Sequence, residues 1–495
     1  MGNFITFPEM LLWLPLLTGV ACFFLKKGNS AKAVALGGSL IVLAIALISL
    51  CYTDVKYDSY NAVPYIWLKY MGAGFHVSLD GTGRLLALLT AVSFPIIFIA
   101  TYKNSYKNAA AFFGLMMLAE CGLMGVFLAK DALLFYFFWE LALIPVYFLC
   151  SIWGGENRIR ATFKFFVYTF TGSLLMLTGI VYIYLHTKPI LVDHILVPHS
   201  FSMLSFYTAG LNESAQQWLF WLFFVAFAIK MPVFPFHTWQ PDTYDQAPTS
   251  VTMVLSGIMV KMGLFGVIKW LIPMFPLAVP KYTSVVMLLS IAGIIYASCI
   301  AMVQDNLKKL VAYSSIAHIG LMCAAIFAMN QIGVQGVMIQ MFSHGINIIG
   351  LWIVIGIIER QTGVKNISQL GGIAQKAPVL TIMLVIIAFA NIALPLTNAF
   401  IGEFMMFSGV FQYKLWMAAV AGLSVILAAC YTLNMIRKVF YGSTNAVTEN
   451  MTDISFGETL GLGLIVAMVF LFGVFPQPMI DLTKDAVAVL VSGVR

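Results

Sequence analysis

Long runs of apolar residues recur along the whole chain and are separated by short polar stretches. Most runs are about 20 residues long, the length a helix needs to cross the hydrocarbon core of a bilayer. Strands of a membrane barrel alternate polar and apolar residues and are about half as long, so a barrel is excluded. The pattern predicts an all-α polytopic membrane protein with about fourteen transmembrane helices. The predicted spans are 8–25, 33–52, 84–102, 109–128, 132–152, 164–186, 217–236, 248–270, 282–303, 310–328, 336–358, 378–410, 415–436 and 459–475.

Two of these spans are predicted to be broken. Pro232 and Pro235 follow Lys230 inside an apolar run, and each proline removes a helix hydrogen bond. The run 378–410 is too long for one crossing and contains Pro395. Broken helices at corresponding places in two halves are typical of transporters built from inverted repeats. We therefore expect two inverted five-helix repeats, each with a broken helix.

These expectations divide the chain into four parts. Residues 1–108 would hold the first three spans, and 109–272 the first repeat with spans four to eight. Residues 273–441 would hold the second repeat with spans nine to thirteen, and 442–495 the last span and a C-terminal tail.

Composition agrees with a membrane protein, because 61% of the 495 residues are hydrophobic and only 9% are charged. The net charge of +7 comes without a dense basic cluster, so we expect no nucleic-acid partner. The excess is better explained by the positive-inside rule, which places both termini on the outer side of the membrane. The loops assigned to the inner side hold, among others, Lys26, Lys27, Arg158, Arg160, Arg360 and Arg437.

A few ionisable residues fall inside the predicted spans. On insertion scales each costs roughly 2.5 to 3.5 kcal/mol if charged at the centre of an isolated helix. Such residues must face the bundle interior, pair or line water, and they are typical of proton or ion pathways. The set comprises Glu120, Glu140, Lys230, Lys261, His318, His344 and Glu403.

Structural explanations compete with a transport role at several of these positions. Lys230 could form a structural salt bridge, and Glu403 could complement the positive end of a restarting helix. Glu120 could lie away from the membrane centre, which leaves its role open. His318 and His344 could ligate a haem or be hydrogen-bonded core residues, but a haem between helices usually draws on more histidines than two.

Other chemistry has no support in the sequence. The seven cysteines lie in or at the ends of apolar segments and form no CxxC motif, so an iron–sulfur cluster or zinc site is not expected. No GxGxxG or GxxxxGK[ST] motif is present, so neither a dinucleotide nor an ATP site is expected. We predict no cofactor and no metal in this chain.

Three stretches resemble one family closely. They are Ala129 to Pro145 with Ile152-Trp153-Gly154-Gly155, then Lys230 to Asp242 with Ala247-Pro248-Thr249 and Gly257 to Lys261, and finally Gln304 to Gly320. Together they resemble the antiporter-like membrane subunits of respiratory complex I (NADH:quinone oxidoreductase) across about 109–436. The second broken helix carries Glu at position 403. In this it resembles the M-type members, the homologues of mitochondrial NADH dehydrogenase subunit four, whereas related types usually carry Lys there.

The resemblance implies a proton-translocating subunit of the membrane arm. Glu140 and Lys230 would form the input pair, and Lys261 and His318 would carry the proton along a central axis, with His344 nearby. Glu403 would hand the proton to the outer side.

The resemblance also implies the setting of this chain. FMN, iron–sulfur clusters and quinone would belong to partner subunits, and the direct partners would be other membrane-arm subunits and the lipid bilayer. The implied location is the bacterial inner membrane, with the mitochondrial inner membrane less favoured.

Three other interpretations remain. The chain could belong to a multisubunit sodium/proton antiporter or to a membrane-bound hydrogenase, which co-purifying subunits would distinguish. A purely structural membrane scaffold is disfavoured by the insertion cost of the buried charges.

Overall fold

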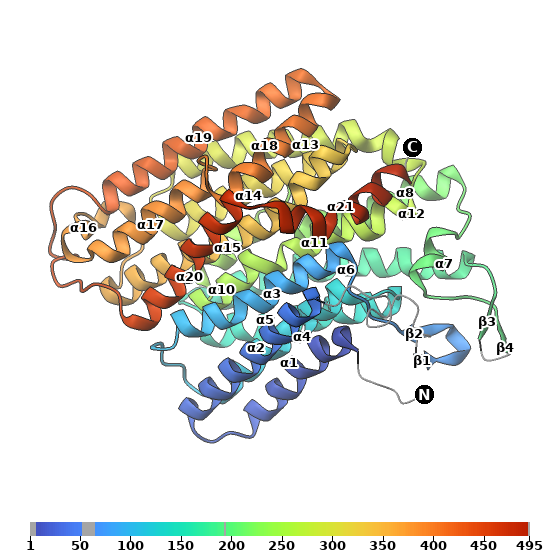
Figure 1. Cartoon of the computed structure of the whole chain (residues 1–495), viewed down its shortest axis with the longest axis horizontal. Helices are drawn as coiled ribbons and strands as arrows, with labels where there is room; N and C mark the ends of the chain where they lie inside the picture. The colour runs from blue at the N-terminus through green and yellow to red at the C-terminus, as the bar shows by residue number, and fades with distance from the viewer. Residues whose placement is uncertain (1–5, 52–64, 193–194, 494–495) are drawn as a thin grey trace.

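A computed structural model describes residues 6–51, 65–192 and 195–493, and its helices run side by side in an elongated bundle (Figure 1). Helices α1 and α2 lie along one edge of the bundle, and α17 and α19 lie along the opposite edge. Helices α10, α11, α14 and α15 lie between these edges, and most of their residues are buried. These four buried helices all lie within residues 249–362.

The helices have the following bounds. The first part contains α1 (Phe7–Phe23), α2 (Gly28–Cys51), α3 (Gly81–Ala100), α4 (Ala109–Leu128), α5 (Ala132–Trp153), α6 (Arg158–His186), α7 (Met203–Tyr207), α8 (Glu213–Lys230), α9 (Trp239–Gln246), α10 (Thr249–Val254), α11 (Lys261–Gly266) and α12 (Ile272–Met274). The second part contains α13 (Ala278–Val303), α14 (Leu307–Phe327), α15 (Gln331–Thr362), α16 (Ile373–Lys376), α17 (Pro378–Asn391), α18 (Asn398–Tyr413), α19 (Leu415–Val439), α20 (Phe456–Val474) and α21 (Gln477–Ser492).

The membrane character predicted from the apolar runs is confirmed. Within the described ranges, 11 helices are long and apolar enough to cross a bilayer, and α1 and α17 are shorter apolar helices. Helix α8 ends at the first predicted break, and helix α18 begins after the second. The mostly helical, multi-pass fold follows from the period and length of the apolar runs.

Both predicted breaks are present. Helix α8 ends at Lys230, two residues before Pro232, and the chain becomes helical again at Trp239. Helix α17 ends at Asn391 and α18 begins at Asn398, with Pro395 between them. The prolines explain the position of each break, because they cannot donate the hydrogen bonds that would continue the helix.

The predicted span at 248–270 is not a plain α-helix. It runs from α10 to α12 through two π-helical segments, η3 (Leu255–Met259) and η4 (Val267–Leu271), with Lys261 between them. In η3 the N–H of Val260 donates to the carbonyl of Leu255, five residues back, at 3.2 Å. π-helical turns of this kind are frequent at functional sites.

Some elements were not predicted from the sequence. Strands β1 (Tyr65–Leu68) and β2 (Ala73–Phe75) form one antiparallel hairpin, and β3 (Ile190–Val192) and β4 (Ile195–Val197) form another. A short 3-10 turn, η2 (Lys69–Met71), joins β1 to β2, and η5 (Ile367–Gln369) precedes α16. The tail after the last span contains α21, which packs on α3 and α15. The start of α1 and the end of α21 point towards the end of the bundle that holds both hairpins (Figure 1).

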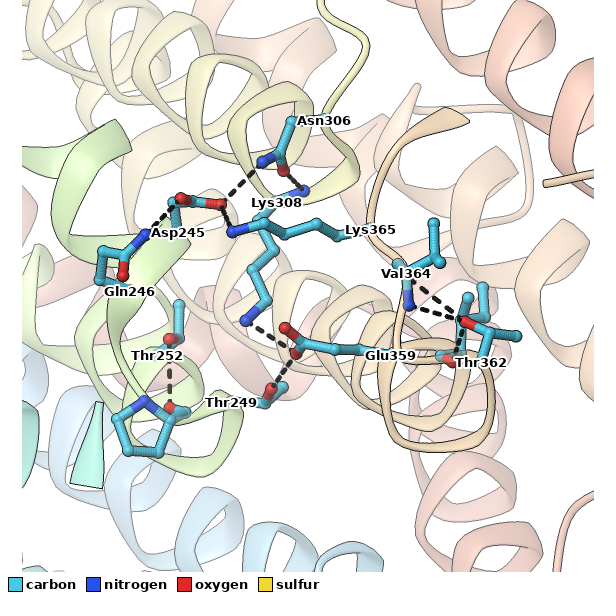
Figure 2. A network of polar contacts seen from close by, with 12 residues as sticks. Asp245, Gln246, Thr249, Thr252, Asn306, Lys308, Glu359, Thr362, Val364 and Lys365 are labelled. Atoms are coloured by element: carbon cyan, nitrogen blue, oxygen red, sulfur yellow. Dashed lines mark hydrogen bonds and ion pairs between the residues drawn. The ribbon is translucent and has the colours of Figure 1, made fainter. Parts of the chain in front are cut away.

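A polar cluster at the opposite end ties several helices together. Asp245 accepts hydrogen bonds from Lys365 and Asn306, both at 2.7 Å, and Lys308 pairs with Glu359 at 2.7 Å. Figure 2 shows these two groups side by side between the end of α9, the start of α14 and the end of α15. Helices α14 and α15, which carry His318 and His344, are therefore joined at this end by polar contacts.

Candidate functional site

The central pair of the site is Lys261 on α11 and His344 on α15. The Lys261 Nζ atom lies 2.9 Å from Nδ1 of His344 and donates to the carbonyl of Ser256 at 2.9 Å. The π-helical turn makes this possible, because Val260 bonds to Leu255 and leaves the Ser256 carbonyl open to the ammonium group. Lys261 is completely buried and His344 almost so.

A second pair joins His318 on α14 to Glu403 on α18. The His318 Nε2 atom lies 3.4 Å from Oε1 of Glu403, and Gln340 donates to the same oxygen at 3.2 Å. Glu403 is the sixth residue of α18, whereas the favourable effect of a helix N-terminus on an acid fades within the first turn. Complementing the helix dipole is therefore a poor explanation for this carboxylate.

The surroundings of His318 favour a doubly protonated ring. Its Nδ1 atom lies 2.7 Å from the carbonyl oxygen of Ser314, and its Nε2 atom lies 3.0 Å from that of Asn391. Carbonyl oxygens only accept, so both ring nitrogens must carry a hydrogen to fill both bonds. The carboxyl group of Glu403 contacts the same Nε2 atom.

The two pairs form one continuous group. The ring centroids of His318 and His344 lie 5.5 Å apart, so His344 stands between Lys261 and His318. The resemblance placed His344 only near the axis, and the structure puts it within the series. The bond between Lys261 and His344 can run in either direction, because each nitrogen donates or accepts according to where the proton resides.

A small cavity touches the far end of this group. Its volume is about 20 Å³, enough for one water molecule, and His318 and Glu403 line it together with Ser424 on α19. Ser424 is only half-buried, so the cavity extends from the buried pair towards the outer face of α19.

Lys230 and Glu140 are placed differently from the other four. Lys230 is the last residue of α8 and is buried, and its ammonium has no hydrogen-bond partner among the described residues. It lies over the ring of Trp139, 5.4 Å from the centroid, and Glu140 on α5 acts on it electrostatically. The expected input pair is thus an electrostatic neighbourhood without a direct hydrogen bond.

Glu120 stands apart from the other six residues. It is fully buried on α4, and neither carboxylate oxygen has a hydrogen-bond partner within the described part of the chain. In that same part, no three His, Cys, Asp or Glu residues lie close enough to hold a metal ion.

Several polar residues of the site were missed by sequence reasoning. Asn391 ends α17 and contacts His318 with its carbonyl, and its side chain donates to Ser314 Oγ at 3.4 Å. Tyr431 donates to the same Ser314 hydroxyl at 2.9 Å, and Gln340 binds Glu403. The sequence did show uncharged amides within apolar runs. An amide indicates a functional residue less strongly than a charge does, because it costs less free energy to bury.

The two breaks share one local feature. Trp239 Nε1, beyond the first break, donates to the Ile229 carbonyl at 2.9 Å, and His318 Nε2 faces the Asn391 carbonyl at the second break. The last carbonyls of a helix lack partners within the helix and need donors from elsewhere. An aromatic ring N–H meets this need at both breaks.

Comparison with known families decides the classification of this fold and site. The family model described as "NADH:quinone oxidoreductase/Mrp antiporter, TM" matches residues 129–428. The chain belongs to this family. The matched region runs from just before α5 into α19. It contains both broken helices and six of the seven ionisable residues predicted within the spans.

Individual members of the family cover nearly the whole chain. NADH-quinone oxidoreductase subunit M of Rhodobacter capsulatus is 35% identical over 98% of this chain and 96% of its own length. F(420)H(2) dehydrogenase subunit M of Methanosarcina mazei is 31% identical over 98% of both chains. A chain of respiratory complex I from Thermus thermophilus superimposes with a TM-score of 0.88 at 28% identity, covering 98% of this chain and 100% of that chain.

Proposed function

We propose that this chain is a proton-translocating membrane subunit of an NADH:quinone oxidoreductase. The observation that carries the proposal is the buried series Lys261, His344, His318 and Glu403, with successive contacts of 2.9, 5.5 (between ring centroids) and 3.4 Å. The membership of the family and the subunit M relatives supply the setting in which protons would be moved. The redox cofactors would be bound by partner subunits.

In this proposal a proton moves along the series by small rearrangements. Lys261 passes a proton to Nδ1 of His344, whose Nε2 faces the interior with no hydrogen-bond partner among the described residues. His318 and Glu403 hold the next proton as a pair, and the cavity beside Ser424 leads outwards. Because His318 and Glu403 are in contact, a proton held there is shared by the pair.

The input side would involve Lys230 and Glu140. A cation at the end of α8 is favoured by the negative end of the helix dipole and by the Trp139 ring. A change in the distance between Lys230 and Glu140 would change how strongly Lys230 holds its proton. This pair is therefore proposed as the place where a conformational signal from partner subunits acts.

The architecture supports inverted repeats with the boundaries expected from the sequence. Each proposed repeat has its break in the fourth of its five spans, α8 with α9 in 109–272 and α17 with α18 in 273–441. An even number of spans places both termini on one side, and the positive-inside rule assigns them to the outer side. The proposed location is the inner membrane of a bacterium.

The test is a purified complex containing this chain, reconstituted into liposomes. We expect the complex to reduce quinone when NADH is added and to acidify the vesicle interior as it does so. We expect Lys261→Met to abolish the acidification attributable to this subunit. Unchanged proton pumping in Lys261→Met would refute the proposed relay.

A second electron donor is favoured by one specific observation, the likeness to an F(420)H(2) dehydrogenase subunit over 98% of both chains. Co-purifying subunits distinguish the two donors, because an NADH-oxidising complex brings a flavin-containing NADH-binding module. Retention of proton pumping with reduced F420 alone would assign the second donor.

A further inference from the structure

Two buried asparagines form a reciprocal pair next to the proposed relay. Asn347 on α15 donates from Nδ2 to Oδ1 of Asn398 at 3.0 Å, and Asn398 donates from Nδ2 to Oδ1 of Asn347 at 3.1 Å. Both side chains are completely buried. An asparagine pair that exchanges both bonds in this way fixes the two side chains in distance and orientation.

The pair lies at a critical point of the chain. Asn398 is the first residue of α18, directly after the break, and Glu403 follows five residues later on the same helix. Five residues correspond to about 7.5 Å along a helix axis. Fixing Asn398 therefore fixes the axial position of Glu403.

One stripe of α15 provides further contacts to α18. Ser343 donates to the Asn398 carbonyl at 3.0 Å, and Gln340 donates to Glu403 at 3.2 Å. Together with Asn347, these residues are spaced at i, i+3 and i+7 and face the same side of α15. His344 lies on the adjacent side, where it meets Lys261 and His318.

Glycines bring α15 and α18 into close contact away from the amide pair. A Cβ at Gly409 would lie 2.4 Å from the Cα of Gly333, and a Cβ at Gly336 would lie 2.8 Å from the Gly402 carbonyl. Small residues let helices approach closely, but a smooth contact resists sliding less than one with specific hydrogen bonds. The amide pair supplies a specific bond at the end of α18 where the chain has just lost helical continuity.

We propose that Asn347 and Asn398 are positioning residues that set the register of α18 on α15 and thereby hold Glu403 against His318. The proposal rests on the proposed relay function, because its effect is expressed through Glu403. It assigns no proton transfer to either amide.

The decisive variant is the double substitution Asn347→Leu with Asn398→Leu in the assembled complex. Leu has the same number and branching of side-chain heavy atoms as Asn, and replacing both partners leaves no buried amide without a bond. We expect normal assembly and quinone reduction but protons pumped per electron pair reduced about tenfold, because a displacement of about 1 Å at reacting groups can cost up to a hundredfold. Pumping equal to that of the unmodified complex would overturn the proposal.

Infrared difference spectroscopy reports on the surroundings of the Glu403 carboxyl group, which a general loss of protein stability would not change. The carboxyl band of Glu403 is identified by its loss in Glu403→Gln, and we expect it to shift in the double Leu variant. An unshifted band would contradict the positioning role.

A matched control removes a different buried hydrogen bond that a side-chain amide of α15 makes. Gln335 donates to Thr483 of α21 at 2.7 Å, so Gln335→Leu with Thr483→Val changes the same helix away from α18. We expect this control to keep both the pumping ratio and the Glu403 band. If it lowers the pumping ratio as much as the double Leu variant, the effect is general and the proposal fails.

Two further variants separate the possible failures. If the double Leu variant does not assemble, Asn398→Ser takes its place, because the serine hydroxyl is polar but too short to reach Asn347. This variant must lower the pumping ratio, and normal pumping in it overturns the proposal. Normal pumping in Glu403→Gln would instead refute the relay itself, whereas loss in Glu403→Gln with normal pumping in the asparagine variants refutes only the positioning role.

Discussion

His318 and Glu403 meet at a single nitrogen atom. The Nε2 atom of His318 lies 3.4 Å from the carboxylate on α18 and 3.0 Å from the carbonyl of Asn391 at the end of α17. One ring nitrogen therefore contacts both halves of the broken helix. A small change at the break would alter how this nitrogen shares its hydrogen between the two oxygens, which links the geometry of the helix to the position of the proton.

Replacing Glu403 with Gln tests this pair. The amide cannot take up a proton or balance the charge on His318, so we expect proton pumping to fall to roughly a tenth or less, within the range that a positioned acid or base contributes. Pumping and quinone reduction are measured together in liposomes. Glu403→Asp, which keeps the charge on a shorter side chain, should retain more pumping than Glu403→Gln, and the reverse order would contradict the pair.

Replacing His344 tests the connection between the two pairs. His344→Phe keeps a ring of similar size but removes Nδ1, which lies 2.9 Å from Lys261. We expect pumping to fall about tenfold or more because the lysine loses its proton acceptor. The ratio of acidification to quinone reduction is the measurement. Full pumping in this variant would show that Lys261 and His318 exchange protons without His344.

Trp139 is expected to tune Lys230 through its ring. Trp139→Leu removes the aromatic face that lies 5.4 Å from Nζ, an interaction of about 2 kcal/mol when desolvated, equivalent to roughly thirtyfold in an equilibrium. Trp139→Phe keeps an aromatic ring and serves as the control for lost volume. Initial pumping rates should decrease in the order Trp, Phe, Leu, and equal rates for Phe and Leu would exclude a role of the ring.

Asp131, at the start of α5, is expected to make stability depend on pH. Burial raises the pKa of Asp131 from 3.8 to about 6, against the opposing effect of hydrogen bonds from the N–H groups of Gly74, Leu134 and Leu133. The folded state therefore holds its proton more tightly than the unfolded state. Stability from this residue is full below about pH 4 and falls as the pH rises through about 6, by roughly 3 kcal/mol in total.

Asp131→Asn provides the measurement for this effect. Asparagine caps a helix as well as aspartate does, so the cap at α5 is retained while the titrating group is removed. The thermal midpoint of the solubilised complex should fall less between pH 4 and pH 7 in the variant than in the unmodified protein. Parallel curves would rule out Asp131 as the source.

Asp80 is expected to stabilise the end of the bundle that holds the hairpins. Burial alone would raise its pKa, but the ammonium groups of Lys130 and Lys269 outweigh burial and hold the pKa of Asp80 well below its usual range. Asp80→Asn would remove the carboxylate that pairs with both the buried Lys130 and the partly exposed Lys269, at a cost of about 3 kcal/mol. We expect the variant to have a lower thermal midpoint, with a decrease that is the same from pH 5 to pH 8. An unchanged midpoint would contradict a stabilising role of the contacts of Asp80 with Lys130 and Lys269.

The order of elements could be read from the sequence because it depends on local properties. Apolar runs of bilayer length predict the spans, and Pro232 and Pro395 predict the two breaks, since proline acts on its own helix. The cost of burying a charge singled out Lys261 and Glu403 for the same reason. Hairpins and α21 escaped prediction because they lie outside the apolar runs, where the membrane imposes no strong pattern.

The partners of each buried group depended on tertiary structure. Nothing in the sequence places His344 between Lys261 and His318, because the three lie on different helices whose rotations follow from packing. The π-helical turn before Lys261 and the amide pair of Asn347 with Asn398 also arise from that packing. The sequence by itself determined which residues are costly to bury and in which span each lies. Only the tertiary structure decided which of them touch, because contact distances of about 3 Å are set by how the helices meet.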